Sequence, residues 1–190
     1  MKNFLMLLVG LLVVAAACTD PDKDPLRFEQ IKKGTLIALR GTATDILAEP
    51  ANRGAMDTFS ISGNVADFSL DFEADLLADD INSLTEVQVY ASLTENAGRV
   101  RIGTVPGSAF SVAAGAGIYP RASVSIPMSD ILSPLGKAIN EFTPNQYIFI
   151  ECDLTLTDGS TVPASSFTNT SLFESALFYP AHKMRMIAKP

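Results

Sequence analysis

Apolar and polar residues alternate along most of the chain after residue 28, with the period of two that is typical of half-buried β-strands. The clearest runs are residues 65–73, where Phe68, Leu70 and Phe72 alternate with acidic or hydroxyl side chains, and residues 87–94. Two consecutive runs of this kind predict an antiparallel sheet with one face on the core.

Shorter apolar runs predict five further strands, separated by clusters of Gly, Pro, Asn and Asp: residues 35–40, 100–105, 122–128, 146–157 and 183–188. About seven strands in one domain is the number of a small β-sandwich. After residues 146–157, Asp158 and Gly159 are expected to supply the positive φ angles of a tight hairpin turn, with a returning strand from Thr161.

The two faces of residues 146–157 differ in character. Cys152 lies on the face that carries Ile148 and Ile150, so we expect a buried core thiol rather than a nucleophile. Tyr147 and Phe149 lie on the opposite face, where the alternation calls for polar residues. Two interpretations stay open: this aromatic pair docks on a partner, or it packs under a neighbouring helix.

That helix is predicted for residues 129–140, the one segment with helical spacing of apolar residues. Ser129 is a suitable N-cap, whereas Pro134 and Gly136 are expected to kink or break the helix. The sequence therefore predicts an all-β antiparallel sandwich, with a short helical crossover near 129–140 that closes one end.

The N-terminus has the pattern of a secretory signal peptide. Lys2 precedes an apolar run over residues 4–14, which is too short to span a bilayer, and three alanines then lead to Cys18. This ending resembles the bacterial lipobox, although Ala15 stands where leucine is usual. The resemblance implies removal of residues 1–17 and lipidation of Cys18. The alternative is an ordinary signal peptide cleaved after Ala17.

Residues 18–27 are expected to form an extended tether, because three aspartates and two prolines in residues 19–25 disfavour helix and strand. An acidic segment directly after the lipobox also resembles the surface-export signal of Bacteroidetes lipoproteins. A generic linker is the alternative. Residues 28–190 would then form a single sandwich domain, anchored by lipid to the outer membrane and exposed on the cell surface.

Composition removes several functional classes. The 190 residues include 21 acidic and 14 basic side chains, a net charge of −7, which disfavours a phosphate-binding surface and excludes nucleic acid as a partner. Two cysteines and one histidine are too few for a zinc finger, an iron–sulfur cluster or a disulfide scaffold. We expect no cofactor and no metal site.

The sequence also offers little catalytic machinery. His182, the sole histidine, is interpreted as a surface residue at the entry to the last strand, and no nucleophile elbow or phosphate loop accompanies it. Asp67, Asp71 and Glu73 have the spacing of a solvent-facing strand; a hydrolase pair and a calcium site are the alternatives. We expect a protein that binds rather than an enzyme.

A binding loop is predicted at residues 113–121. Glycines and small residues give this segment conformational freedom, Tyr119 offers a stacking ring and Arg121 a charged fork. The alternative is a loop with Tyr119 packed back on the core. The candidate binding residues are therefore Tyr119 and Arg121, together with Tyr147 and Phe149.

Two segments carry a family resemblance. Residues 129–159, with Pro134-Leu135-Gly136 and the run from Phe142 to Phe149, resemble the C-terminal half of immunoglobulin-like Bacteroidetes surface lipoproteins encoded beside Sus-type TonB-dependent transporters. Residues 28–37 are similar to their first strand. The resemblance implies an immunoglobulin-like sandwich, a TonB-dependent transporter complex as partner and a glycan or other nutrient as ligand.

The chain departs from that family in one respect, because it has no tryptophan, on which such proteins often stack sugars. A structural, assembly or adhesion subunit of a surface complex, with no small ligand, is the alternative function.

Overall fold

The structure is a computed structural model that describes residues 35–41, 55–78, 80–112, 119–167 and 182–190, within the compact unit Thr35–Pro190. The expectations for residues 1–34, including the signal peptide, Cys18 and the tether, lie outside the described residues, as does most of the loop predicted at 113–121. In the described part of the chain, no helix combines the length and apolar character needed to cross a membrane.

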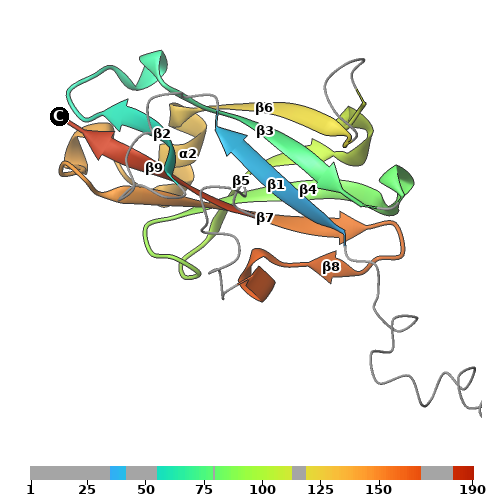
Figure 1. Ribbon diagram of the computed structural model, residues 1–190. Coiled ribbons are helices and arrows are strands. Elements are labelled where there is room, and N and C mark those ends of the chain that lie inside the picture. Colours follow the sequence, from blue (N-terminus) through green and yellow to red (C-terminus); the bar gives the residue numbers. More distant parts are fainter. Residues whose placement is uncertain (1–34, 42–54, 79, 113–118, 168–181) are drawn as a thin grey trace, which may run out of the picture. The chain divides into compact units, whose positions relative to one another are not determined.

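The described strands form two sheets (Figure 1). The first has the order β1-β3-β6, with every pair antiparallel: β1 (Leu36–Gly41), β3 (Ser69–Leu77) and β6 (Arg121–Pro127). The second has the order β2-β9-β7-β4-β5, with β8 also on β7: β2 (Ala55–Ser60), β4 (Leu84–Ser92), β5 (Val100–Pro106), β7 (Tyr147–Leu156), β8 (Thr161–Val162) and β9 (Lys183–Lys189).

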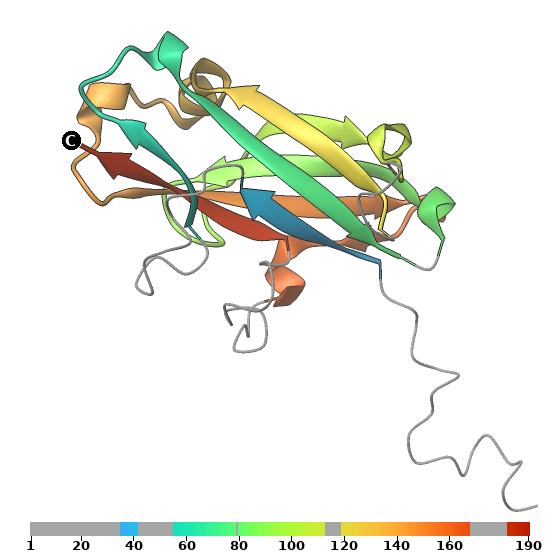
Figure 2. The same cartoon turned by 45° about the horizontal axis from the view of Figure 1, so that its top comes forward.

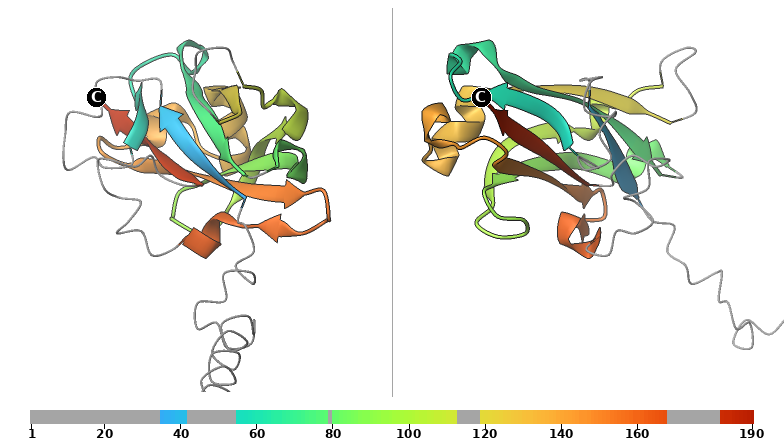
Figure 3. Two further views of the ribbon diagram at one scale, coloured as in Figure 1. Left: turned by 45° about the vertical axis from the view of Figure 1, so that its right-hand side comes forward. Right: turned by 60° about the vertical axis from the view of Figure 1, so that its left-hand side comes forward.

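The two sheets lie one over the other (Figure 3). Their buried apolar side chains form one core. Alternation places fully buried side chains on both sheets: Ile37, Leu39, Leu70, Leu76, Val89, Ile148, Ile150 and Leu154. Cys152 lies among them as a free thiol with no exposed surface, which confirms the expectation for this residue. Burial raises the pKa of its thiol well above the usual range, so the group is inert at neutral pH.

Several predicted boundaries and strand relations are wrong. The structure has nine strands in its described part rather than about seven, and β2 pairs with β9 in parallel, so the arrangement is not wholly antiparallel. Residues 65–67 form a 3-10 turn, η5 (Val65–Asp67), because the Asn64 side chain accepts the Ala66 N–H and starts a turn there.

The predicted helix is present but shorter. Helix α2 (Met128–Leu135) directly follows β6, and it buries Met128, Ile131 and Leu132 against β4, β5, β6 and η5 (Figure 2). Ser129 lies inside the first turn rather than at the N-cap, which is Pro127. Gly136, with φ of 63°, ends the helix, after which only the single 3-10 turn η8 (Ile139–Glu141) continues the segment.

The turn after β7 also differs from the expectation. Only Gly159 has a positive φ, 81°, and the Leu156 N–H bonds to the Ser160 carbonyl across a three-residue loop. This is the pattern of a type I turn followed by a glycine bulge, not of a two-residue turn with two positive φ angles. The short strand β8 returns from this loop, as expected.

His182 is fully buried, so its interpretation as a surface residue is wrong. Its ring Nδ1 lies 2.9 Å from the Cys152 carbonyl oxygen and its Nε2 lies 3.3 Å from the Ile37 N–H nitrogen. Its backbone N–H donates to the Ile37 carbonyl and its carbonyl accepts from the Cys152 N–H. One residue therefore joins β1 of the first sheet to β7 of the second.

These contacts require a neutral ring, because Nδ1 must donate to a carbonyl while Nε2 accepts from an N–H. Burial lowers the pKa of His182 from 6.5 to about 4, which agrees with this tautomer. A positive φ of 61° at His182 adds local strain that the four hydrogen bonds offset.

Because the folded-state pKa of His182 lies below its unfolded value, the protein should be most stable above about pH 6.5 and lose stability as the pH falls toward 4. The expected loss from this one group is about 3 kcal/mol. Urea unfolding between pH 4 and 7.5 measures it. The His182→Asn variant should be less stable at pH 7 and show a flatter pH dependence; equal slopes for both proteins would contradict the assignment.

Candidate ligand-binding groove

An open groove of about 320 Å³ lies on the outer side of the six-stranded sheet, at the end where the chain leaves α2 and enters β7. Its lining residues come from three separate segments of the chain: Leu93, Lys137, Phe142, Asn145, Gln146, Tyr147 and Phe149. We call this feature the aromatic groove. It contains both residues of the aromatic pair singled out by the sequence.

Three of the lining residues are aromatic, and we call these the floor of the groove and the other lining residues its walls. Tyr147 and Phe149 are half-buried neighbours on one face of β7, with ring centroids 6.1 Å apart and planes tilted by 48°. Phe142 is buried and packs edge-on against Phe59, with centroids 5.2 Å apart. Because Phe59 belongs to the core, the floor is continuous with the rigid interior of the domain.

A tight turn over residues 143–146 sets the start of β7. Pro144 followed by Asn145 with φ of 70° fits a type II turn, and the Gln146 N–H bonds to the Thr143 carbonyl. The Gln146 side-chain Oε1 accepts the Thr143 N–H at 2.8 Å. Backbone bonds from Asn145 and Gln146 to Ala188 then fasten the turn to β9.

The end of α2 positions the next wall. The Lys137 N–H bonds to the Leu132 carbonyl across Gly136, which is the six-to-one bond of a Schellman motif. The Lys137 ammonium lies 5.2 Å from the Phe142 ring centroid, within reach of a cation–π contact. Lys137 is the only residue of the predicted helical segment 129–140 that lines the groove. The apolar face of α2 points into the core.

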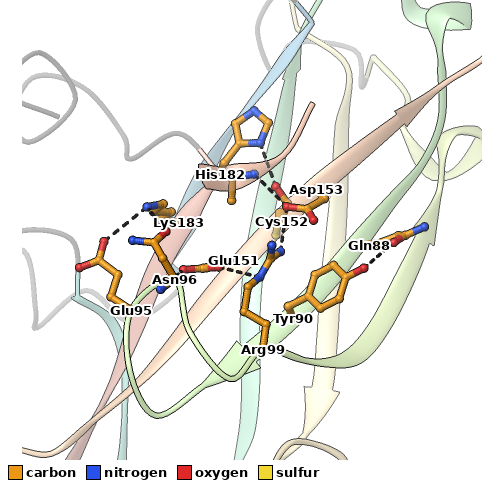
Figure 4. Close-up of polar contacts among 11 residues, drawn as sticks. Gln88, Tyr90, Glu95, Asn96, Arg99, Glu151, Cys152, Asp153, His182 and Lys183 are labelled. Atoms are coloured by element: carbon orange, nitrogen blue, oxygen red, sulfur yellow. Dashed lines mark hydrogen bonds and ion pairs between the residues drawn. The ribbon is translucent and has the colours of Figure 1, made fainter. Parts of the chain in front are cut away.

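The loop between β4 and β5, residues 93–99, supplies Leu93, which is 41% exposed. The alternation predicted Leu93 inside the sheet, but β4 ends at Ser92 and the chain turns away, with positive φ angles at Asn96 and Gly98. Arg99 closes this loop over the outer face of the sheet, with its guanidinium carbon 4.2 Å from the centroid of the Tyr90 ring (Figure 4).

Two carboxylates of β7 hold Arg99 in place. Its Nη2 lies 2.8 Å from Asp153 Oδ1, and its Nε lies 2.7 Å from Glu151 Oε2. The second contact is too bent to count as a hydrogen bond, so we describe it as an ion pair. Glu151 is nearly fully buried, and its other oxygen accepts the Asn96 N–H at 3.0 Å. Lys183 adds a bond to the Asn96 side chain at 2.9 Å.

The other two predicted binding residues lie elsewhere. Tyr119 is 44% exposed, not packed on the core, and Arg121 begins β6 of the three-stranded sheet. The Arg121 guanidinium is engaged by its own sheet, with Glu73 at 2.8 Å and Asp75 at 2.6 Å. Asp75 is buried and forms an internal ion pair with Arg121. The structure therefore does not bring the two predicted pairs together.

The chemistry that the aromatic groove offers is non-covalent. Ring faces can stack on apolar or sugar surfaces, and the amides and the ammonium at its walls can bond to polar groups of a ligand. Among the described residues, no three His, Cys, Asp or Glu side chains gather as a metal site would require. The sequence indicated the groove only through Tyr147 and Phe149, the aromatic pair on the polar face of the strand. Nothing in the sequence pattern pointed to Leu93 or Lys137 as lining residues.

We expect the Arg99→Leu variant to lose about 3 kcal/mol of unfolding free energy, because Glu151 would stay buried without its cation. Chemical denaturation measures the loss. The matched control is Arg101→Leu, since Arg101 is an exposed arginine on β5 and should cost less than about 0.5 kcal/mol. Similar costs for both variants would show that the loop closure adds nothing to stability.

Comparison with known proteins places the chain in no family. No family model matches it, and neither does any curated protein. It is similar to a solved structure of murine CRIg at 9% sequence identity, over 70% of this chain and 88% of that one, with a TM-score of 0.27. A similarity at that level carries no argument about function.

Proposed function

We propose that this chain is a lipid-anchored protein of the bacterial cell envelope that binds its ligand in the aromatic groove and has no catalytic role. The observation that carries the proposal is the groove itself: an open surface with aromatic rings in its floor and amide and ammonium groups at its walls. Contiguous apolar surface rimmed by polar groups often marks a binding site.

We further propose an immunoglobulin-like sandwich as the framework. The order β9-β7-β4-β5 in one sheet and β1-β3-β6 in the other supports this, because it corresponds to strands G, F, C and C′ facing A, B and E of a variable-type domain. Cys152 occupies the F-strand position of the usual inter-sheet disulfide, yet it is a free thiol here. The core then depends on apolar packing in place of that bridge.

The ligand class we propose is a glycan. Sugar rings present apolar C–H faces that stack on aromatic side chains, while their hydroxyls bond to amides such as those of Asn145 and Gln146. The lipidation predicted at Cys18 and the acidic tether predicted after it favour a place on the outer membrane surface. There the protein would serve as an accessory component of a TonB-dependent transporter, holding a glycan or related nutrient near its entrance.

Binding to a glycan array tests the ligand class and the site together. Tyr147→Ala should weaken binding by roughly tenfold, since it removes one stacking face from the groove floor. Tyr119→Ala is the matched control, because it removes an exposed tyrosine on the other side of the fold. Loss of binding in the control variant alone would move the site to the loop before β6 and overturn the groove as the binding site.

Affinity isolation from native membranes tests the transporter partnership. Protein tagged at Pro190 should co-purify with a TonB-dependent transporter, as identified by mass spectrometry. The Cys18→Ala variant should leave the membrane fraction and lose that partner, because the lipid would no longer be attached. Recovery of assembly or adhesion components instead would favour a structural subunit of a surface complex.

A further inference from the structure

The walls of the aromatic groove carry hydrogen-bond donors and positive charge but no carboxylate. Among its seven lining residues, Lys137 is a cation, Asn145 and Gln146 are amides, and none is Asp or Glu. The chain as a whole has a net charge of −7, with more acidic than basic side chains. A groove lined by a cation and by no acidic side chain therefore differs in charge from the rest of the protein.

Within the part of the chain that the structure describes, Lys137 forms no ion pair with an acidic side chain. Glu141 follows it closely in sequence, but the Glu141 carboxylate accepts the Ala138 N–H at 2.6 Å, and only its backbone carbonyl approaches Lys137, at 3.4 Å. The ion pairs found among the described residues involve Arg99, Arg121 and Lys183. Lys137 thus holds its charge over the Phe142 ring, at the wall of the groove.

A second cation, Arg185, lies close to the Tyr147 ring, although it does not line the groove. Arg185 pairs with Phe149 in the ladder between β7 and β9, and its guanidinium carbon lies 5.2 Å from the Tyr147 ring centroid. The Gln146 Oε1 is already occupied by the Thr143 N–H, so its amide nitrogen is the group left to face a ligand, as a donor. Ammonium and amide donors around a stacking surface match a sugar that bears anionic oxygens.

We propose that the aromatic groove binds an anionic glycan, whose carboxylate or sulfate oxygens bond to Lys137 while a sugar ring stacks on Tyr147 and Phe149. This inference rests on the proposed function, since it names the class of glycan for the same groove. It also assigns roles: the rings recognise the sugar, and Lys137 distinguishes a charged polymer from a neutral one.

Four polymers test the charge preference by biolayer interferometry on the immobilised full chain. Polygalacturonate is compared with its fully methyl-esterified, uncharged form, and dextran sulfate with dextran. At least one acidic polymer should bind about tenfold more tightly than its neutral counterpart, in line with one charge-assisted hydrogen bond. Whichever pair shows the difference identifies carboxylate or sulfate as the recognised group.

Single variants distinguish binding in the aromatic groove from nonspecific attraction to the positive charges of the protein. Lys137→Gln should weaken binding of the acidic polymer about tenfold and weaken binding of the neutral polymer less, because glutamine can still bond to hydroxyl groups but carries no charge. Arg101→Gln, which removes an exposed charge on β5, should change neither, and Tyr147→Ala should weaken both. Equal losses in Lys137→Gln and Arg101→Gln would overturn the inference, because binding would then follow net charge alone.

The remaining outcomes distinguish this inference from the proposed function. Equal affinity for charged and neutral polymers, with no effect of Lys137→Gln, overturns the anionic preference but leaves glycan binding in place. If none of the four polymers binds, the anionic preference is also overturned, and the glycan array then tests the proposed function separately. Binding of neutral glycans on the array would keep glycan binding as the function. Binding of no glycan on the array would overturn both the function and the inference.

Discussion

The hydrogen bonds of His182 join the two sheets at a point where neither sheet could complete its own pairing. On one edge of β7, the partner changes from β9 to β8, and Cys152 lies at the change. His182 satisfies both backbone groups of Cys152 and, through its ring and its own N–H, both backbone groups of Ile37 on β1. Buried backbone groups left unpaired would each cost about 1–3 kcal/mol, so this residue stabilises the junction far beyond its own packing.

The same junction includes features that the sequence pattern did not predict. Alternation located the central strands, because burial of one face leaves a period of two that short segments display clearly, as in β3, β4 and β7. It missed β2, which buries Phe59 and whose pairing partner β9 lies far away in the sequence. It also placed His182 on the surface, since a histidine buried by backbone hydrogen bonds has no periodic signature.

The groove was partly predictable for a related reason. Tyr147 and Phe149 attracted notice because they break the polar side of a strand. Leu93 begins the loop that contains Asn96 and Gly98, and Lys137 follows Gly136; these three residues have the positive φ angles that set the course of the chain there. Such turns decide where a wall residue points, and the contacts that fix them, above all Arg99 with Glu151 and Asp153, join residues that are far apart in the chain.

The division of the groove between strand and turns has a consequence for how the protein could change over evolutionary time. Its floor is tied to the core through the contact of Phe142 with Phe59, so a substitution of Phe142 would disturb folding. Its walls at Leu93, Lys137 and Asn145 lie on connections that leave the core untouched. If the groove binds a ligand as proposed, a lineage could exchange one ligand for another by altering a few wall positions while the domain kept its stability.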